Sequence, residues 1–152
     1  MKIALGCDHG GFEHKNAIAE HLKENGFEVL DVGIYEEKPV DYPDIALKVC
    51  KSILSGDCER GILVCGTGIG MSIAANKVKG IRAAACSDHF SAKYTRLHNN
   101  SNVLCLGGRV IGIGTAIELT DLFVETDFEG GRHQNRVDKI SEIEKNGGKY
   151  NG

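Results

Sequence analysis

Short apolar runs alternate with helical patterns along almost the whole chain, and this alternation restricts the possible folds more than any other feature. Five runs rich in Ile, Val, Leu and Ala are typical of buried strands, and they cover residues 2–7, 27–33, 61–65, 81–86 and 102–108. Helical patterns follow them at residues 12–22, 41–53, 69–78, 89–98, 113–124 and 132–146. This order predicts a mostly parallel five-stranded α/β sheet with helices on both faces.

The composition fits one globular domain and argues against several classes of partner. A length of 152 residues predicts a single domain over residues 1–152, with a last helix at about 132–146 and a short tail. The net charge of -3 and the lack of a basic run argue against nucleic acid and anionic membranes. The first apolar run is too short for a signal peptide. Glycines interrupt the apolar residues 61–75, which are too few to span a bilayer. We therefore expect a cytoplasmic protein.

Polar residues and glycines gather where the expected strands end. The motifs at these positions are CDHGG (7–11), CGTGIG (65–70), CSDH (86–89) and GGR (107–109). In open α/β sheets, ligands bind outside the carboxyl ends of the strands. We therefore expect the functional site at this edge of the sheet.

The glycine-rich segment after the third strand predicts an anion-binding loop. Alternate glycines remove side chains and permit positive φ, so that successive backbone N–H groups can converge at a helix N-terminus. Such a loop could hold a phosphate or a developing oxyanion. The segment does not match a dinucleotide fingerprint, because Met71 stands where the last Gly or Ala is needed, and it lacks the Gly-Lys-Ser/Thr of a P-loop. A simple tight turn would explain the glycines but not Cys65 and Thr67 beside them.

Cys65 is the strongest candidate for a reactive cysteine. It ends a strand next to the glycine loop, where N–H groups at a helix N-terminus would stabilise a thiolate that acts as nucleophile or base. The alternative is a small buried apolar residue, which is the interpretation preferred for Cys50, Cys58 and Cys105. The six cysteines form no C-x-x-C pair, so free thiols are expected.

A metal site at the same sheet edge is an alternative to a reactive cysteine. Side chains that could ligate zinc gather at the expected sheet edge, namely Cys7, Asp8, His9, Cys65, Cys86, Asp88 and His89. None of their spacings is that of a standard ligand pair, so no metal is expected.

The histidines and arginines divide into candidate site residues and candidate surface residues. His9 follows the first strand and faces the expected site, whereas His98 ends a helix beside Asn99. The alternative for both is a surface position at a helix terminus. Three other histidines fall in helical segments rich in polar residues, and we expect them to be exposed to solvent: His14, His21 and His133.

Arg132 and Arg136 lie four residues apart, on one helical face, and with Arg109 they could clamp a phosphate. A solvated helix face is the alternative.

Motifs throughout the chain resemble one known enzyme family. They are GCDHGGF, DYPD, CGTGIGMSIAANKVKGIRAA, HNNSNVLCLGGRVIG and EGGRHQNRV, and they occur in order over nearly the whole sequence. Together they are similar to the type B ribose-5-phosphate isomerases, of the group that includes galactose- and allose-6-phosphate isomerases. The resemblance implies a single-domain Rossmann-like three-layer α/β/α sandwich that uses no cofactor. It implies interconversion of ribose 5-phosphate and ribulose 5-phosphate in the non-oxidative pentose phosphate pathway.

The resemblance also implies roles for individual residues. Cys65 resembles the base that takes the C2 proton, His98 the group that opens the sugar ring, and Asp8 the proton carrier between O1 and O2. The family's enediolate hole, the group of donors that binds the enediolate, is matched here by a run of five residues: Gly66, Thr67, Gly68, Ile69 and Gly70. In this comparison Thr67 touches the substrate. The residues that match the family's phosphate contacts are His9, Arg109, Arg132 and Arg136. Those that match its further substrate contacts are Tyr42 and Asn99. A branch of the family that lacks the cysteine has a glutamate at the position of Met71, so this chain is similar to the cysteine type.

The same resemblance implies self-association as a homodimer or a tetramer. The site would lie between two subunits, with Arg109 supplied by the partner. Three alternatives stay open from the residues themselves: an isomerase of six-carbon sugar phosphates, a Cys–His hydrolase that uses Cys65 as nucleophile, and a sugar-phosphate sensor without turnover.

Overall fold

The computed structural model describes residues 1–149, and its strands and helices alternate as expected. The strands are β1 (Lys2–Cys7), β2 (Glu28–Asp31), β3 (Arg60–Cys65), β4 (Ala83–Ala85) and β5 (Val103–Gly107). The helices are η1 (His9–Gly11), α1 (Phe12–Glu24), α2 (Tyr42–Leu54), α3 (Ile69–Ala75), α4 (His89–Asn99), α5 (Ile113–Glu125) and α6 (Arg132–Lys145). Residues 150–152, the end of the expected tail, lie outside the described residues.

The five strands form one sheet in the order β2-β1-β3-β5-β4, and every neighbouring pair is parallel. This confirms the predicted parallel sheet. The order is that of a doubly wound sheet 2-1-3-4-5 with its last two strands exchanged, because β5 inserts between β3 and β4. The chain turns to opposite sides after β1 and after β3, so the topological switch point lies between these two strands. Their carboxyl ends carry Asp8 and Cys65.

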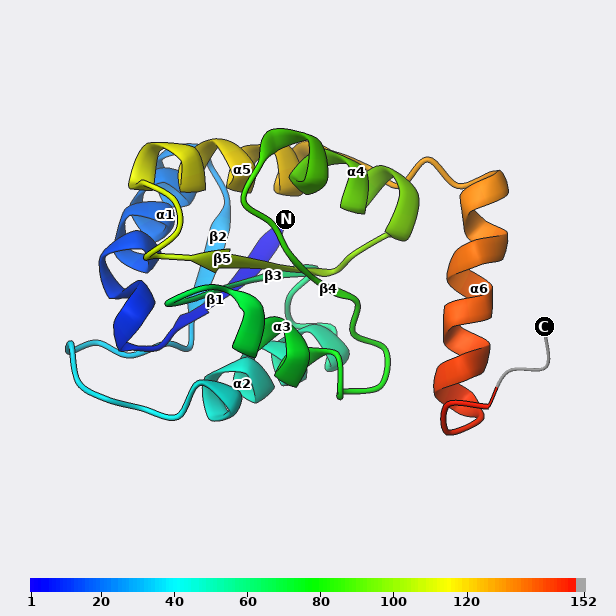
Figure 1. Cartoon of the computed structure of the whole chain (residues 1–152). Helices are drawn as coiled ribbons and strands as arrows, with labels where there is room; N and C mark the ends of the chain where they lie inside the picture. Colours follow the sequence, from blue (N-terminus) through cyan, green and yellow to red (C-terminus); the bar gives the residue numbers. More distant parts are fainter. Residues whose placement is uncertain (150–152) are drawn as a thin grey trace.

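Helices cover both faces of the sheet, which confirms the three-layer α/β/α sandwich. Figure 1 shows α1, α4 and α5 over one face and α2 and α3 over the other. Contacts pair α1 and α4 with α5, and α2 with α3. The last helix, α6, stands at the side of the sandwich and packs on α4 (Figure 1). None of the helices within residues 1–149 has the length and apolar character needed to cross a membrane.

Side-chain hydrogen bonds explain where the structure departs from the predicted boundaries. The helix expected over residues 69–78 ends at Ala75, because the side chain of Asn76 binds the backbone of Ala83. Asn76 Oδ1 accepts from Ala83 N and Nδ2 donates to Ala83 O, each at 2.8 Å. The short helix η1 has no apolar periodicity, and the carboxylate of Asp8 caps it. Local polar contacts of this kind are invisible to a pattern of apolar residues.

Two buried arginines fix the connection between α5 and α6. Arg60 donates to the backbone oxygens of Phe123 and Val124, at the end of α5. Arg96 donates from Nε to Thr126 O at 3.1 Å. Burial lowers the pKa of Arg96 to about 10, so this guanidinium still carries its charge at neutral pH. These bonds satisfy carbonyls that the helix end leaves open, and they hold the first residues of the connection to α6.

One charged pair is buried beside the carboxyl end of β1. Lys15 is 1% exposed, and its Nζ lies 2.6 Å from Asp31 Oδ2 at the end of β2. Nζ also donates to Ile34 O at 3.1 Å. The pair therefore ties the first turns of α1 to the segment that follows β2, next to the expected site.

Replacement of Lys15 tests how much this ion pair contributes to the free energy of unfolding. Lys15→Ala leaves the carboxylate of Asp31 without its cation, and we expect the free energy of unfolding to fall by about 3 kcal/mol. Urea denaturation measures the change. The exposed pair of Lys38 and Glu36 gives the control, because Lys38→Ala should change stability by no more than about 0.5 kcal/mol. Equal effects of the two substitutions would contradict the argument.

Candidate functional site

Backbone hydrogen bonds join three segments at the carboxyl edge of the sheet. Asp8 N, after β1, donates to Val64 O of β3 at 3.2 Å. Gly108 N, after β5, donates to Cys65 O at 2.8 Å, and Arg109 N donates to Gly66 O at 3.0 Å. Three of the four motifs that the sequence placed at strand ends therefore meet at the carboxyl edge of the sheet.

The loop from Cys65 to Gly70 needs glycine for its shape. Gly68 adopts φ 77°, and a Cβ there would lie 3.0–3.1 Å from backbone atoms of Cys105 and Leu106. In this conformation Gly68 N donates to Cys65 Sγ at 3.1 Å, directly before α3 begins. The loop thus points at least one backbone N–H group at the sulfur, and a negative charge on that sulfur would be stabilised.

The other cysteines lack this arrangement. Burial raises the pKa of Cys7, Cys50 and Cys86 to about 11, and it raises the pKa of Cys105 well above its usual value. These thiols stay protonated at neutral pH and act as small apolar groups. This agrees with the interpretation of Cys50 and Cys105 as packing residues, and Cys58 is buried in the same way.

Asp8 lies close to the glycine loop, and Thr67 is part of that loop. Asp8 is 7% exposed, and its Oδ1 accepts from Gly10 N at 2.8 Å, which fixes the carboxylate at the start of η1. Thr67 is exposed, and its Oγ1 accepts from Ile69 N at 3.3 Å. A carboxylate in a fixed position and an accessible hydroxyl therefore stand beside the glycine loop.

His9 and Arg109 of the same chain line one cavity. Both line a cavity of about 200 Å³ together with Phe12, at the start of α1. A methyl group at Gly66 would lie 3.6 Å from Cδ of Arg109, so this arginine reaches the loop of its own chain. The expectation that a partner supplies Arg109 is therefore wrong, because the backbone bond between Arg109 and Gly66 holds it at the site of its own subunit.

Tyr42 closes the other side of the loop. A Cβ at Gly70 would lie 2.9 Å from Cζ of the Tyr42 ring, so the ring rests on the backbone at the start of α3. Only glycine at position 70 leaves room for this ring. These contacts define what we call the edge group: Asp8, His9, Tyr42, Cys65 with the loop to Gly70, and Arg109.

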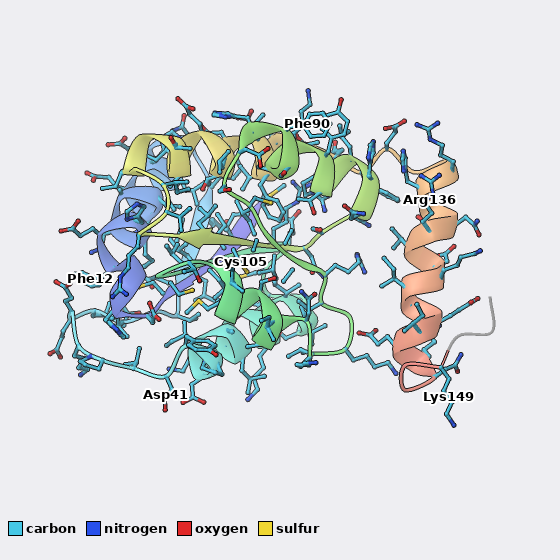
Figure 2. The ribbon with its side chains drawn as sticks, viewed as in Figure 1. Phe12, Asp41, Phe90, Cys105, Arg136 and Lys149 are labelled. Carbon is cyan, nitrogen blue, oxygen red and sulfur yellow. The ribbon has the colours of Figure 1, made fainter. Side chains whose placement is uncertain are left out.

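The remaining candidate residues lie elsewhere, and we call them the arm group: His98, Asn99, Arg132 and Arg136. His98 and Asn99 end α4, just before β5 begins, and therefore lie at the amino edge of the sheet. β5 has five residues, so its ends are about 13 Å apart at ~3.3 Å per residue. In Figure 2, Arg136 lies beside α6, across the molecule from Phe12. Within one chain the two groups do not meet.

A histidine that the sequence analysis assigned to the surface belongs with the arm group. His133 is 2% exposed, and its ring stacks on that of His98 with centroids 4.0 Å apart. The prediction that His133 is solvated was therefore wrong. A signal was present, because His133 lies four residues before the buried Val137 and therefore on the same face of α6.

The two histidines and Glu129 form the one group of His, Cys, Asp or Glu side chains within residues 1–149 with metal-ligand spacing. Two arginines disfavour a cation there. Arg132 Nε lies 3.5 Å from His133 Nε2, and Arg136 Nη1 lies 3.5 Å from His133 Nδ1. The charge of the arm group therefore suits an anion better.

The side chains at the sheet edge that could ligate zinc do not form a group with metal-ligand spacing within residues 1–149. Asp88 instead caps α4 through Ser91 N at 2.8 Å, and His89 Nε2 lies 2.5 Å from Glu118 Oε2. His14 and His21, like them, have structural partners: His14 Nε2 lies 2.8 Å from Ile111 O, and His21 Nε2 lies 2.7 Å from Asp121 Oδ1.

Comparison with known proteins places these features in a family. Residues 3–140 match the model of the Ribose/Galactose Isomerase family. Ribose-5-phosphate isomerase B of Escherichia coli is 49% identical over 143 residues, which cover 94% of this chain and 96% of the relative.

Solved structures agree. The structure of Clostridium thermocellum ribose-5-phosphate isomerase B matches with a TM-score of 0.94 and 52% identity, covering 96% of this chain and 99% of that one. The Mycoplasma genitalium ribose-5-phosphate isomerase B with bound ribulose-5-phosphate matches with a TM-score of 0.90 and 44% identity, covering 95% and 96%. The chain belongs to the Ribose/Galactose Isomerase family.

Proposed function

We propose that this chain is an aldose–ketose isomerase that interconverts ribose 5-phosphate and ribulose 5-phosphate. The observation that carries the proposal is the hydrogen bond from Gly68 N to Cys65 Sγ, inside the glycine loop that leads into α3. Support comes from the Escherichia coli relative, named ribose-5-phosphate isomerase B, and from the Mycoplasma genitalium structure that holds ribulose-5-phosphate. Isomerisation through an enediolate requires a base beside a carbon acid and donors for the oxyanion.

The edge group supplies the carbon chemistry. The thiolate of Cys65 takes the C2 proton of the open-chain aldose, and the C–H electron pair forms the C1–C2 double bond. The C1=O pair moves onto O1, where the N–H groups of the glycine loop and the hydroxyl of Thr67 stabilise the charge. Asp8 carries a proton between O2 and O1. The thiol of Cys65 then returns its proton to C1, and the ketose forms without a net change in oxidation state.

The arm group supplies ring opening and part of the phosphate site. Ribose 5-phosphate exists mainly as a furanose, so a group must protonate the ring oxygen and take the proton of the anomeric hydroxyl. His98 is half-buried, and an imidazole can give one proton and take another. Arg132 and Arg136 are exposed on one face of α6 and can bind the phosphate, which His9 and Arg109 contact from the edge group.

A second copy of the chain brings the two groups together in this proposal. Since His98 lies at the amino edge and Cys65 at the carboxyl edge, one chain cannot place both on a five-carbon sugar. A two-fold homodimer can, with the arm group of each subunit over the edge group of the other, and symmetry then gives two equivalent sites. A tetramer would contain two such pairs. A cytoplasmic location and a place in the pentose phosphate pathway stay predictions.

A substrate panel tests the reaction. We expect isomerisation of ribose 5-phosphate to exceed that of allose 6-phosphate and galactose 6-phosphate in kcat/KM, measured by coupled assays of each ketose product. Free ribose should be turned over poorly, because it lacks the phosphate that the arginines bind. A preference for a six-carbon phosphate would identify the alternative isomerase. Binding without turnover would identify a sensor, and a covalent adduct with burst kinetics a hydrolase.

Replacement of Cys65 tests the base. Cys65→Ala should keep binding ribulose 5-phosphate but lose about 10²–10⁴-fold in kcat, because no group remains to move the carbon-bound proton. Steady-state assays and titration calorimetry measure the two effects. Cys50→Ala is the matched control, since Cys50 is a buried thiol outside the edge group and should keep most of the activity. Near-normal turnover by Cys65→Ala would refute the assignment.

Mixing of inactive variants tests the shared site. With ribose 5-phosphate as substrate, the Cys65→Ala and His98→Asn chains are each expected to lose most of their activity. When they are unfolded together and refolded, a mixed dimer has one site with intact Cys65 and intact His98. Random pairing should therefore restore about a quarter of wild-type activity.

The control pair for this experiment is Cys65→Ala with Arg109→Ala. Both residues belong to the edge group of one chain, so each site of a mixed dimer keeps one defect and activity should stay lost. Restoration by the control pair, with none by Cys65→Ala and His98→Asn, would contradict the proposed arrangement. Mass spectrometry confirms that mixed dimers have formed.

A further inference from the structure

His133 occupies a position that the polar character of α6 does not explain. The buried side chains of this helix are His133 and Val137, and most of its other residues are exposed. Val137 packs as an ordinary apolar residue would. A buried imidazole requires partners instead, because an unsatisfied polar group is costly away from water.

The nitrogens of the His133 ring lie 3.5 Å from Arg132 Nε and from Arg136 Nη1, and the face of the ring lies on His98. The two imidazoles lie nearly parallel, with an interplanar angle of 12° and centroids 4.0 Å apart. On α4 itself, the edge of the Tyr94 ring meets His98 at a centroid distance of 4.8 Å and an angle of 78°. The imidazole of His98 is therefore confined by one ring of its own helix and by one ring of α6.

Glu129 closes the same cluster from the connection between α5 and α6. Its Oε2 lies 3.9 Å from Nε2 of His98 and 3.8 Å from Nε2 of His133. Its backbone N donates to Leu97 O at 3.1 Å, which ties the connection to the end of α4. The stack is thus held by three separate segments of the chain.

The charge state of His133 suits a supporting role. Burial lowers its pKa, and the nearby charges of His98, Arg132 and Arg136 lower it further, against the opposing effect of Glu129. His133 is therefore uncharged at neutral pH. A neutral ring can stack on His98 whether that residue carries one proton or two. A group that opens a sugar ring must pass through both states, because it gives a proton to one oxygen and takes one from another.

We propose that His133 is a positioning residue for ring opening, which holds the imidazole of His98 by ring stacking and does not itself touch the reacting atoms. The inference rests on the proposed function, in which His98 opens the furanose. It assigns α6 a second task beside phosphate binding, because the helix that carries Arg132 and Arg136 also sets the orientation of the acid–base group.

Two measurements on the same enzyme separate ring opening from the carbon chemistry. Ribulose 5-phosphate cannot close to a furanose, because its O5 carries the phosphate. Exchange of its C1 proton with D₂O, followed by NMR, therefore reports on the Cys65 step without ring opening. Turnover of ribose 5-phosphate requires both steps.

His133→Ala should slow ribose 5-phosphate turnover by about tenfold to a hundredfold, because His98 loses its fixed orientation. Deuterium exchange into ribulose 5-phosphate should stay within about twofold of wild type. His133→Phe keeps a flat ring without nitrogens, and it should recover most of the lost turnover. Val137→Ala is the matched packing control, because it truncates the other buried side chain of α6 and should leave the ratio of the two rates unchanged.

The results that overturn the proposal are distinct. If His133→Ala loses both activities equally, His133 serves folding or substrate binding in general. If neither activity falls, it has no role in the reaction. If His133→Phe is as poor as His133→Ala, the nitrogens matter and stacking does not. A wild-type chain that exchanges no proton and turns over no ribose 5-phosphate would refute the proposed function instead.

Discussion

The backbone hydrogen bonds at the carboxyl edge of the sheet are the constraint on which the candidate site depends. Gly108 N and Arg109 N bind the oxygens of Cys65 and Gly66, so the segment after β5 is fixed against the segment after β3. Gly68, at φ 77°, then turns its N–H back to Cys65 Sγ. Nearly all of these bonds join backbone groups, so the shape of the loop around Cys65 depends on the fold rather than on mobile side chains.

The position of the arm group depends on how α6 is attached to the sandwich. Arg96 binds Thr126 O and Glu129 N binds Leu97 O, so the connection to α6 is fixed on the end of α4. This attachment brings His133 onto His98 and sets Arg132 and Arg136 beside them. It also holds all of these residues away from Cys65. The same contacts that organise the arm group therefore keep it apart from the edge group of its own chain, which is why the proposed reaction includes a second copy of the chain.

Two errors of the sequence analysis have the same cause. Arg109 was assigned to a partner subunit, but it lies beside Gly66 of its own chain. His133 was assigned to solvent, but it is buried against His98. In both cases the deciding contact joins residues more than thirty positions apart and involves a polar or aromatic group. Periodicity reports which face of an element is apolar, and it carries no information on which distant polar group lies opposite.

The sequence alone determined the parallel sheet, the order of its elements and the place of the glycine loop. These follow from local properties: the apolar runs of buried strands, the helical spacing between them and the rule that ligands bind at the carboxyl edge. Tertiary structure decided what local properties cannot. It inserted β5 between β3 and β4, and it divided the candidate residues into an edge group and an arm group at opposite ends of the sheet. That division depends on which end of each helix adjoins which end of its strand, and only the packed chain fixes this in space.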